Sequence, residues 1–275
     1  MSAMADKRGT GGEVQEDRRV QARRKAAVLR QAQASADRRR RQWVIGGAVA
    51  AVIAVAVAVG VVVQQNRAAS TAALGAGPFA APSGAVGDGS LAIPYGAAGA
   101  RTVLTVYEDF RCPYCRLAES ALEPVYKSFV TAGTVRVQYH LVDLIDRNLG
   151  GTGSIRAGNA GACAQSAGKF PAYHDVLYAD QPDENDDAYG SNAKLISLAQ
   201  QVPGLDTAAF RACVNADTHG SWVRKNYDAL STLLGGSAAT PYYAVNGVQF
   251  KLSPQTAAAQ QTAFKNALQA AVAAG

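Results

Sequence analysis

The feature that most constrains this chain is an uncharged apolar run from Trp43 to Val63, "WVIGGAVAAVIAVAVAVGVVV". At about 1.5 Å of rise per residue, a helix of this length just crosses a hydrocarbon core of about 30 Å. Helices buried in globular domains seldom lack a polar face over such a length. The run therefore predicts a transmembrane helix, and the residues on its two sides must fold separately.

A cleaved secretory signal is the main alternative for this run. The apolar core of such a signal is only about 7 to 15 residues long and follows a short basic region. Here the run is longer and follows a tail of 42 residues. We therefore favour a membrane anchor, and cleavage of the N-terminal segment stays open.

Positive charge is concentrated before the apolar run. Residues 1–42 hold 12 Lys and Arg against 5 Asp and Glu, whereas the remainder of the chain holds 15 against 16. Because basic residues stay on the cytoplasmic side, residues 1–42 are predicted to be a cytoplasmic basic tail and the rest extracytoplasmic. The tail suits anionic lipid headgroups at the cell membrane better than nucleic acid.

Composition divides the remainder of the chain into two parts. Residues 64–90 are rich in Ala, Gly, Pro and Ser, which predicts a flexible linker. Residues 91–275 have a globular composition and are numerous enough to bury one full core.

The order of elements in this domain predicts an α/β fold. "RTVLTVYEDF" (101–110) and "TVRVQYHLV" (134–142) have the β-branched and aromatic content of strands, and a helical pattern starting at Tyr114 separates them. Strand, helix and strand in this order indicate a βαβ unit with a parallel sheet. Residues from about 155 to 234 hold only helical stretches.

The C-terminal region carries a hairpin signal and a helix signal. Asn246 and Gly247 lie between two short strand patterns, as in a hairpin with a two-residue type I′ turn. Ser253 is predicted to cap a final helix that has Pro254 in its first turn.

The candidate chemistry lies in "DFRCPYCRLAE", where Cys112 and Cys115 are three residues apart at a helix start. This spacing places both sulfur atoms on one face, close enough for a disulfide. The free N–H groups and positive dipole end of the helix lower the pKa of the first thiol. We expect Cys112 to be the exposed attacking sulfur and Cys115 the buried resolving one.

Two other interpretations of the cysteine pair are weaker. Zinc needs four ligands, usually with a second close pair, but Cys163 and Cys213 lie far apart in the sequence and no histidine is paired with a cysteine. A purely structural disulfide across so short a loop would stabilise the fold little. Redox cycling remains the favoured function of the pair.

Three segments resemble a known family: "VLTVYEDFRCPYC", the helical block, and "GGSAATPYYAVNG". Together with "LYADQPDEN" followed by "LISLA", they look like the DsbA-type thiol-disulfide oxidoreductases, in particular the membrane-anchored actinobacterial kind. The resemblance covers nearly all of residues 90–275. It implies a thioredoxin fold interrupted by a helical domain.

The resemblance also assigns roles to particular residues. Thr240 and Pro241 match the family's cis-proline motif, which packs against the cysteine pair and offers its backbone to a substrate peptide. Cys163 and Cys213 match a second disulfide of actinobacterial relatives, although the sequence alone equally allows two buried free thiols. The dipeptide Pro113-Tyr114 differs from the Pro-His of the best-known strong oxidant, so the redox potential stays open.

The remaining polar motifs have simpler explanations. The acidic run "DENDD" (183–187) lacks the glycine and closing glutamate of a calcium loop, so a solvated turn is expected and no metal is assigned. His140, His174 and His219 have no triad partner in the sequence and are interpreted as surface or core residues. Glu108 and Asp109, just before the pair, are candidates for tuning proton transfer.

The sequence therefore predicts a membrane-anchored enzyme with no cofactor beyond its own Cys112–Cys115 disulfide. It would oxidise reduced secreted or cell-envelope proteins, and the resemblance implies reoxidation by a membrane oxidase of the DsbB or VKOR type. A disulfide reductase or isomerase is the alternative enzyme. A non-catalytic thioredoxin-like binding module with idle cysteines is the alternative from another class.

Overall fold

The computed structural model describes residues 25, 47, 53–62, 74–252 and 256–275, and residues 53–62 are helical. None of the helices in these described ranges is both long and apolar enough to cross a membrane. Of the transmembrane helix expected over 43–63, residue 47 and residues 53–62 are described, and the rest lies outside the described residues. Of the basic tail expected over 1–42, only residue 25 is described. The chain divides after Asn66 into two units, and the second holds the folded domain.

The centre of this domain is the strand–helix–strand unit expected from the sequence. Strand β2 (Thr102–Glu108) leads into helix α2 (Pro113–Thr131), which returns the chain to strand β3 (Val135–Leu141). The two strands are parallel, with Leu104 opposite Val137. Leu104, Val106, Val137 and Tyr139 are buried, so the apolar residues of both strands lie in the core.

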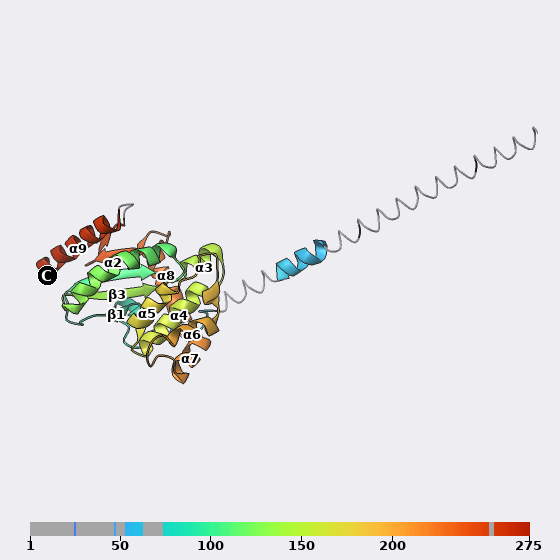
Figure 1. The fold of residues 1–275 in the computed structure, drawn as a ribbon, viewed down its shortest axis with the longest axis horizontal. Coiled ribbons are helices and arrows are strands. Elements are labelled where there is room, and N and C mark those ends of the chain that lie inside the picture. The colour runs from blue at the N-terminus through green and yellow to red at the C-terminus, as the bar shows by residue number, and fades with distance from the viewer. Residues whose placement is uncertain (1–24, 26–46, 48–52, 63–73, 253–255) are drawn as a thin grey trace, which may run out of the picture. The chain divides into compact units, whose positions relative to one another are not determined.

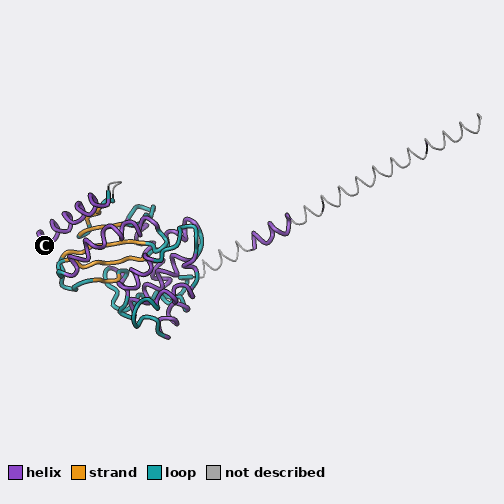
Figure 2. The backbone as a smooth tube through the Cα atoms, viewed as in Figure 1, coloured by secondary structure: helices purple, strands orange, loops and turns teal. Residues whose placement is uncertain are grey.

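Three further strands complete a sheet of order β1-β3-β2-β4-β5 (Figure 2). Strand β4 (Tyr242–Val245) is antiparallel to β2, and β5 (Val248–Phe250) follows it as a hairpin. Asn246 and Gly247 have φ values of 49° and 81°, as the type I′ turn requires. Strand β1 (Ile93–Tyr95), which pairs with β3, was not predicted, because three residues around a proline carry little strand signal.

Helices cover both faces of the sheet. On one face α2 lies beside the C-terminal helix α9 (Ala257–Ala274), whose Phe264 contacts the rings of Tyr243 and Phe250. Helix α9 begins after Thr256, which accepts a hydrogen bond from the N–H of Ala259. The predicted start at Ser253 was therefore wrong, because Thr256 supplies the same capping chemistry three residues later; residues 253–255 lie outside the described part.

The region between β3 and β4 is helical, as expected. Its elements are α3 (Leu144–Leu149), α4 (Gly153–Ser166), α5 (Phe170–Ala179), η2 (Ala188–Gly190), α6 (Asn192–Ala199), α7 (Ala208–Asn215) and α8 (Gly220–Leu233). Most of them gather on the side of the domain away from α9 (Figure 1), while Leu230 of α8 packs with Tyr107 and Tyr242 on the second face of the sheet. The result is a thioredoxin-like α/β fold with a helical insertion.

Helix α4 is the centre of the insertion and is buried along almost its whole length. A side chain at Gly158 would place its Cβ 2.9 Å from Val223 of α8, and one at Gly161 would lie 3.0 Å from Leu141 of β3. Glycine at these two positions lets α8 and the sheet approach the α4 backbone closely.

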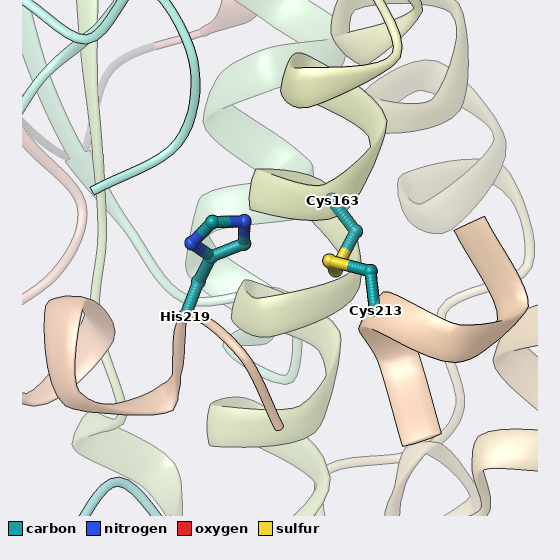
Figure 3. A group of neighbouring side chains, drawn as sticks. All are labelled: Cys163, Cys213 and His219. Carbon is teal, nitrogen blue, oxygen red and sulfur yellow. A yellow bond between two sulfur atoms is a disulfide. The ribbon is translucent and has the colours of Figure 1, made fainter. Parts of the chain in front are cut away.

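The disulfide implied by the family resemblance is present between Cys163 of α4 and Cys213 of α7 (Figure 3). Their Cα atoms are 5.9 Å apart and the cysteines are 50 residues apart in the sequence. Closing a loop of this length contributes roughly 4 kcal/mol in the chain-entropy treatment. The bond therefore helps to hold an insertion made largely of short helices.

Residues 74–90, the N-terminal arm, differ from the flexible linker expected over 64–90. The arm is bound to the insertion: His219 Nδ1 lies 2.8 Å from the Ala80 carbonyl, and Ser221 donates to the Pro78 carbonyl. The indole of Trp222 donates to the Ser90 carbonyl. Composition alone missed this because backbone carbonyls, not large apolar side chains, make most of these contacts.

Candidate active site

Cys112 and Cys115 lie where the carboxyl end of β2 meets the start of α2. Cys112 is the N-cap residue of α2, with φ −74° and ψ 117°, and Pro113 occupies the first turn. Proline suits this position because its fixed φ is helical and it has no N–H to leave unpaired. Neither cysteine is in a disulfide, so the pair is reduced, and the first turn of α2 brings the two side chains together.

The cis-proline loop lies against this pair. The Thr240–Pro241 peptide bond is cis, and the Thr240 carbonyl oxygen is 3.7 Å from Cys112 Sγ. Cys112 is consequently only 3% exposed and Cys115 fully buried, so the expectation of an exposed Cys112 was wrong. Tyr114, between them, is 69% exposed and marks the open side of the site.

The two thiols have opposite pKa shifts. The pKa of Cys112 is lowered to about 6, mainly by a hydrogen bond from the Cys115 thiol, against the opposing effect of burial; Thr240 and the N–H groups of Cys115 and Tyr114 lower it further. Burial raises the pKa of Cys115 well above its ordinary value, and the charges of Cys112 and Glu108 add to this effect. One sulfur is therefore a stable thiolate at neutral pH while its neighbour keeps its proton.

A buried charged cluster of Glu108, Glu119 and His174 lies next to Cys115. His174 Nε2 is 2.8 Å from Glu108 Oε1, and Glu119 accepts hydrogen bonds of 2.5 Å from the hydroxyls of Tyr126 and Tyr243. None of the three cluster members is more than 3% exposed. Burying three ionisable groups is costly unless they pair, so the cluster binds β2, α2 and α5 to one another.

Protons are held unevenly within this cluster. Burial, together with the charge of Glu108, raises the pKa of Glu119 to about 7. Burial lowers the pKa of His174, but Glu108, the neighbouring Asp175 and Glu119 outweigh this effect and raise it well above the ordinary value, so the imidazole is protonated. Glu119 is thus the member that exchanges a proton near neutral pH.

Sequence reasoning identified Glu108 but missed Glu119 and assigned His174 no role. A signal for Glu119 existed: it follows Cys115 by four residues, so both point to the same buried face of α2. His174 carried no such signal, because it reaches Glu108 only through the packing of α5 beside β2.

Asp109 has a different role from Glu108. Its carboxylate accepts the N–H groups of Arg111 and Ile145, and burial raises its pKa to about 8. Arg111 in turn pairs with Asp146 at 2.6 Å and with Asp187 at 3.1 Å. Asp109 and Arg111 therefore fix the turn before Cys112 to the insertion.

Among the described residues, three groups of side chains have the composition of a metal site. In one of them, Glu123, His174 and Asp175, both carboxylates pair with Lys127. The atoms of Glu108, Glu119 and His174 lie within 4.8 Å of one another but bond to each other and to tyrosines. Cys163, Cys213 and His219 are equally close, with both sulfurs joined in the disulfide (Figure 3). In the "DENDD" run, Asp187 accepts the N–H groups of Thr152 and Gly153, which is a structural role.

Comparison with known proteins decides the family. The thioredoxin family model Thioredoxin_4 matches residues 90–269. The chain belongs to this thioredoxin family. Among curated protein sequences no significant match is found.

Several solved structures of thiol-disulfide oxidoreductases are similar to this chain. The disulfide bond oxidoreductase DsbG of Mycobacterium tuberculosis is 26% identical over 68% of this chain and 96% of its own, with a TM-score of 0.54. The oxidised DsbA of the same organism is also 26% identical, covering 66% of this chain and 98% of its own, with a TM-score of 0.53. BdbD of Bacillus subtilis, at 21% identity and a TM-score of 0.56 over 71% of this chain and 97% of its own, shares the fold.

Within the thioredoxin family, this chain is a thiol-disulfide oxidoreductase of the DsbA type, with Cys112 and Cys115 as its active-site cysteines. The geometry suits that chemistry, because thiol-disulfide exchange needs one stabilised thiolate and one adjacent thiol that can release and recover a proton.

The thiolate of Cys112 is directly measurable. In the reduced protein, we expect the alkylation rate by iodoacetamide to rise with pH and to reach half its maximum near pH 6, because only the thiolate reacts. Cys115 should stay unmodified in the folded protein over this range. An inflection near the ordinary thiol value of about 8.5 would contradict the stabilised thiolate.

Proposed function

We propose that this protein is a membrane-anchored, extracytoplasmic oxidase that introduces disulfides into secreted and cell-envelope proteins through Cys112. The observation that carries the proposal is the position of Cys112 at the N-terminus of α2, within reach of the Cys115 thiol and of two backbone N–H groups. Stabilising this thiolate favours the reduced dithiol, so the disulfide form readily gives up its bond to a substrate.

The exchange proceeds in two steps that move two electrons from substrate to enzyme. A substrate thiolate attacks Cys112 Sγ, the bond to Cys115 breaks, and Cys115 leaves with that electron pair and takes up a proton. A second substrate thiolate then attacks the substrate sulfur of the mixed disulfide. This step releases Cys112 as the stabilised thiolate and leaves a disulfide in the substrate.

The buried charged cluster is suited to supply the proton that Cys115 needs. Cys115 feels the charge of Glu108, and Glu119 holds a proton in part of the molecules near pH 7. A pocket between α2 and α5, about 380 Å³ in volume, is lined by Glu119, His174 and Tyr178 and provides access for water. The cluster would thus deliver a proton to Cys115 and refill from solvent.

Substrate binding is proposed at the cis-proline loop, beside Cys112. The carbonyl of Thr240 is close to the reacting sulfur, and Pro241 leads directly into β4. The exposed side chains of Tyr114 and Leu117, on the first two turns of α2, add apolar surface close to Cys112. An extended segment of unfolded substrate can pair its backbone with this loop while its cysteine meets Cys112.

The location and the reoxidising partner complete the proposal. The apolar run at 43–63 and the basic tail before it support a single-pass anchor with a cytoplasmic N-terminus and contacts to anionic lipids. The Cys163–Cys213 disulfide supports an oxidising compartment. A membrane oxidase of the DsbB or VKOR type would then restore the Cys112–Cys115 disulfide.

The redox potential tests the direction of the reaction. Equilibration with glutathione buffers should place the Cys112–Cys115 couple nearer to about −120 mV, as for DsbA, than to about −270 mV, as for thioredoxin. This gap corresponds to roughly 7 kcal/mol for two electrons, so the two roles are well separated. A value below roughly −230 mV would support a reductase instead.

Membrane topology is tested with alkaline phosphatase fusions expressed in bacteria. A fusion after Gly275 should be active in intact cells and should sediment with membranes, whereas a fusion after Gln42 should be inactive, because the enzyme matures only outside the cytoplasm. The reverse pattern would overturn the proposed location. Active fusion protein released from membranes would indicate a cleaved signal.

The proton supply predicts a pH effect of Glu119→Gln. Glutamine can accept from one of the two tyrosine hydroxyls that Glu119 binds, Tyr126 and Tyr243, and donate to the other, but it holds no titratable proton. The rate at which a substrate thiol opens the enzyme disulfide should lose its inflection near pH 7 in this variant. Glu123→Gln on the same helix is the matched control and should keep the inflection. An inflection near pH 7 that persists in Glu119→Gln would exclude the buried charged cluster as the proton source.

A further inference from the structure

The side chain of Gln181 contacts the active-site turn from the helical insertion. Gln181 lies two residues after the end of α5 and is 7% exposed. Its Nε2 donates to the carbonyl of Phe110 at 2.8 Å and to the carbonyl of Cys112 at 3.0 Å. One side-chain amide therefore holds the backbone on both sides of Arg111.

These contacts are made at a point that controls the Cys112 thiolate. The Cys112 carbonyl also accepts the N–H groups of Cys115 and Arg116, the first hydrogen bonds of α2. The orientation of this peptide group decides how the first turn of α2 presents its remaining N–H groups to Cys112 Sγ. In addition, donation from Gln181 draws negative charge away from a carbonyl on the same residue as the thiolate.

The loop that carries Gln181 is fixed to the same turn in return. Arg111 donates to the Glu184 carbonyl at 2.9 Å, and Arg116 donates to the Gln181 carbonyl at 3.3 Å. Asp187, at the end of this loop, pairs with Arg111. The loop and the turn are thus cross-linked by side chains from both segments.

Packing alone does not explain a glutamine here. Its Oε1 is buried and has no hydrogen-bond partner among the described residues. Burying an unpaired amide oxygen is unfavourable, and an apolar side chain of similar size would fill the same space without that cost. What a glutamine supplies here, and an apolar side chain does not, are the two hydrogen bonds that its N–H₂ group donates.

We propose that Gln181 is a positioning residue of the DsbA-type dithiol, which holds the turn before α2 and thereby makes the oxidising strength of the Cys112–Cys115 pair depend on the helical insertion. The inference rests on the proposed oxidase function. It gives the insertion a part in the chemistry in addition to its part in the fold.

The test compares Gln181→Met, which has a similar size and no donor, with Gln181→Glu, which has the same shape and an acceptor in place of the donor. Both should raise the pH at which Cys112 alkylates at half its maximal rate. Both should also shift the glutathione equilibrium toward the Cys112–Cys115 disulfide. The equilibrium constant should change by roughly fivefold in Gln181→Met, which loses the amide hydrogen bonds, and by more in Gln181→Glu, which also adds a negative charge. Gln201→Met, at an exposed glutamine of the insertion, is the matched control and should change neither.

Folded Gln181 variants with unchanged alkylation profiles and an unchanged equilibrium would overturn the proposal. So would a loss of thermal stability without either shift, because it would show a merely structural role. A wild-type protein whose cysteines do not exchange with glutathione would overturn the oxidase function itself, and this inference with it.

If the variants do not fold, a measurement on the wild-type protein tests whether Gln181 is coupled to the Cys112 thiolate. In the ¹⁵N-labelled reduced protein, the side-chain amide signals of Gln181 should titrate together with the Cys112 thiolate, whereas those of Gln201 should not. Gln181 signals that stay constant while Cys112 ionises would overturn the proposal.

Discussion

The parallel pairing of β2 with β3 is the constraint on which the rest of the structure depends. Parallel neighbours require a crossover, and here the crossover is α2, which must begin where β2 ends. That junction is where Cys112 lies, so the geometry of the sheet places the reactive sulfur at a helix N-terminus. The dipole and free N–H groups found there are a consequence of the topology rather than of the cysteines themselves.

A second constraint comes from the charges buried beneath the junction. Glu108 ends β2, Glu119 lies one turn after Cys115, and His174 reaches them from α5. None of these groups could remain charged in the core alone, so each requires the others. The cluster makes the insertion and the sheet depend on each other, and it places a group that titrates near neutral pH beside the least acidic thiol.

The insertion and the rest of the domain also depend on each other at the active-site turn before α2. Arg111, Asp146 and Asp187 form one set of contacts, and Gln181 forms another with the carbonyls of Phe110 and Cys112. The dithiol is therefore enclosed by α2, by the cis-proline loop and by the loop after α5. This enclosure explains why Cys112 is so little exposed although it is the sulfur that reacts with the substrate.

Several parts of this arrangement followed from local sequence. The β-branched and aromatic content of β2 and β3, the hairpin turn at Asn246-Gly247, and the Cys112–Cys115 spacing each depend on a few adjacent residues. Each of these features was predicted. Family resemblance added the Thr240–Pro241 loop and the Cys163–Cys213 bond, which join segments that are distant in the sequence.

By itself, the sequence determined the strand–helix–strand order, the helical insertion and the reactive cysteine pair, because periodicity and local spacing encode them. Only the tertiary structure decided that the arm before Leu91 binds the insertion, that α9 starts after Thr256, and that His174, Glu119 and Gln181 converge on the dithiol. Glu119 lies on α2, whereas His174 and Gln181 belong to α5 and the loop after it. The spacing of Glu119 from Cys115 is a local pattern, but only the packing of the insertion brings His174 and Gln181 to the same place. Burial strengthens the hydrogen bonds that these side chains make, and burial depends on the fold of the whole domain.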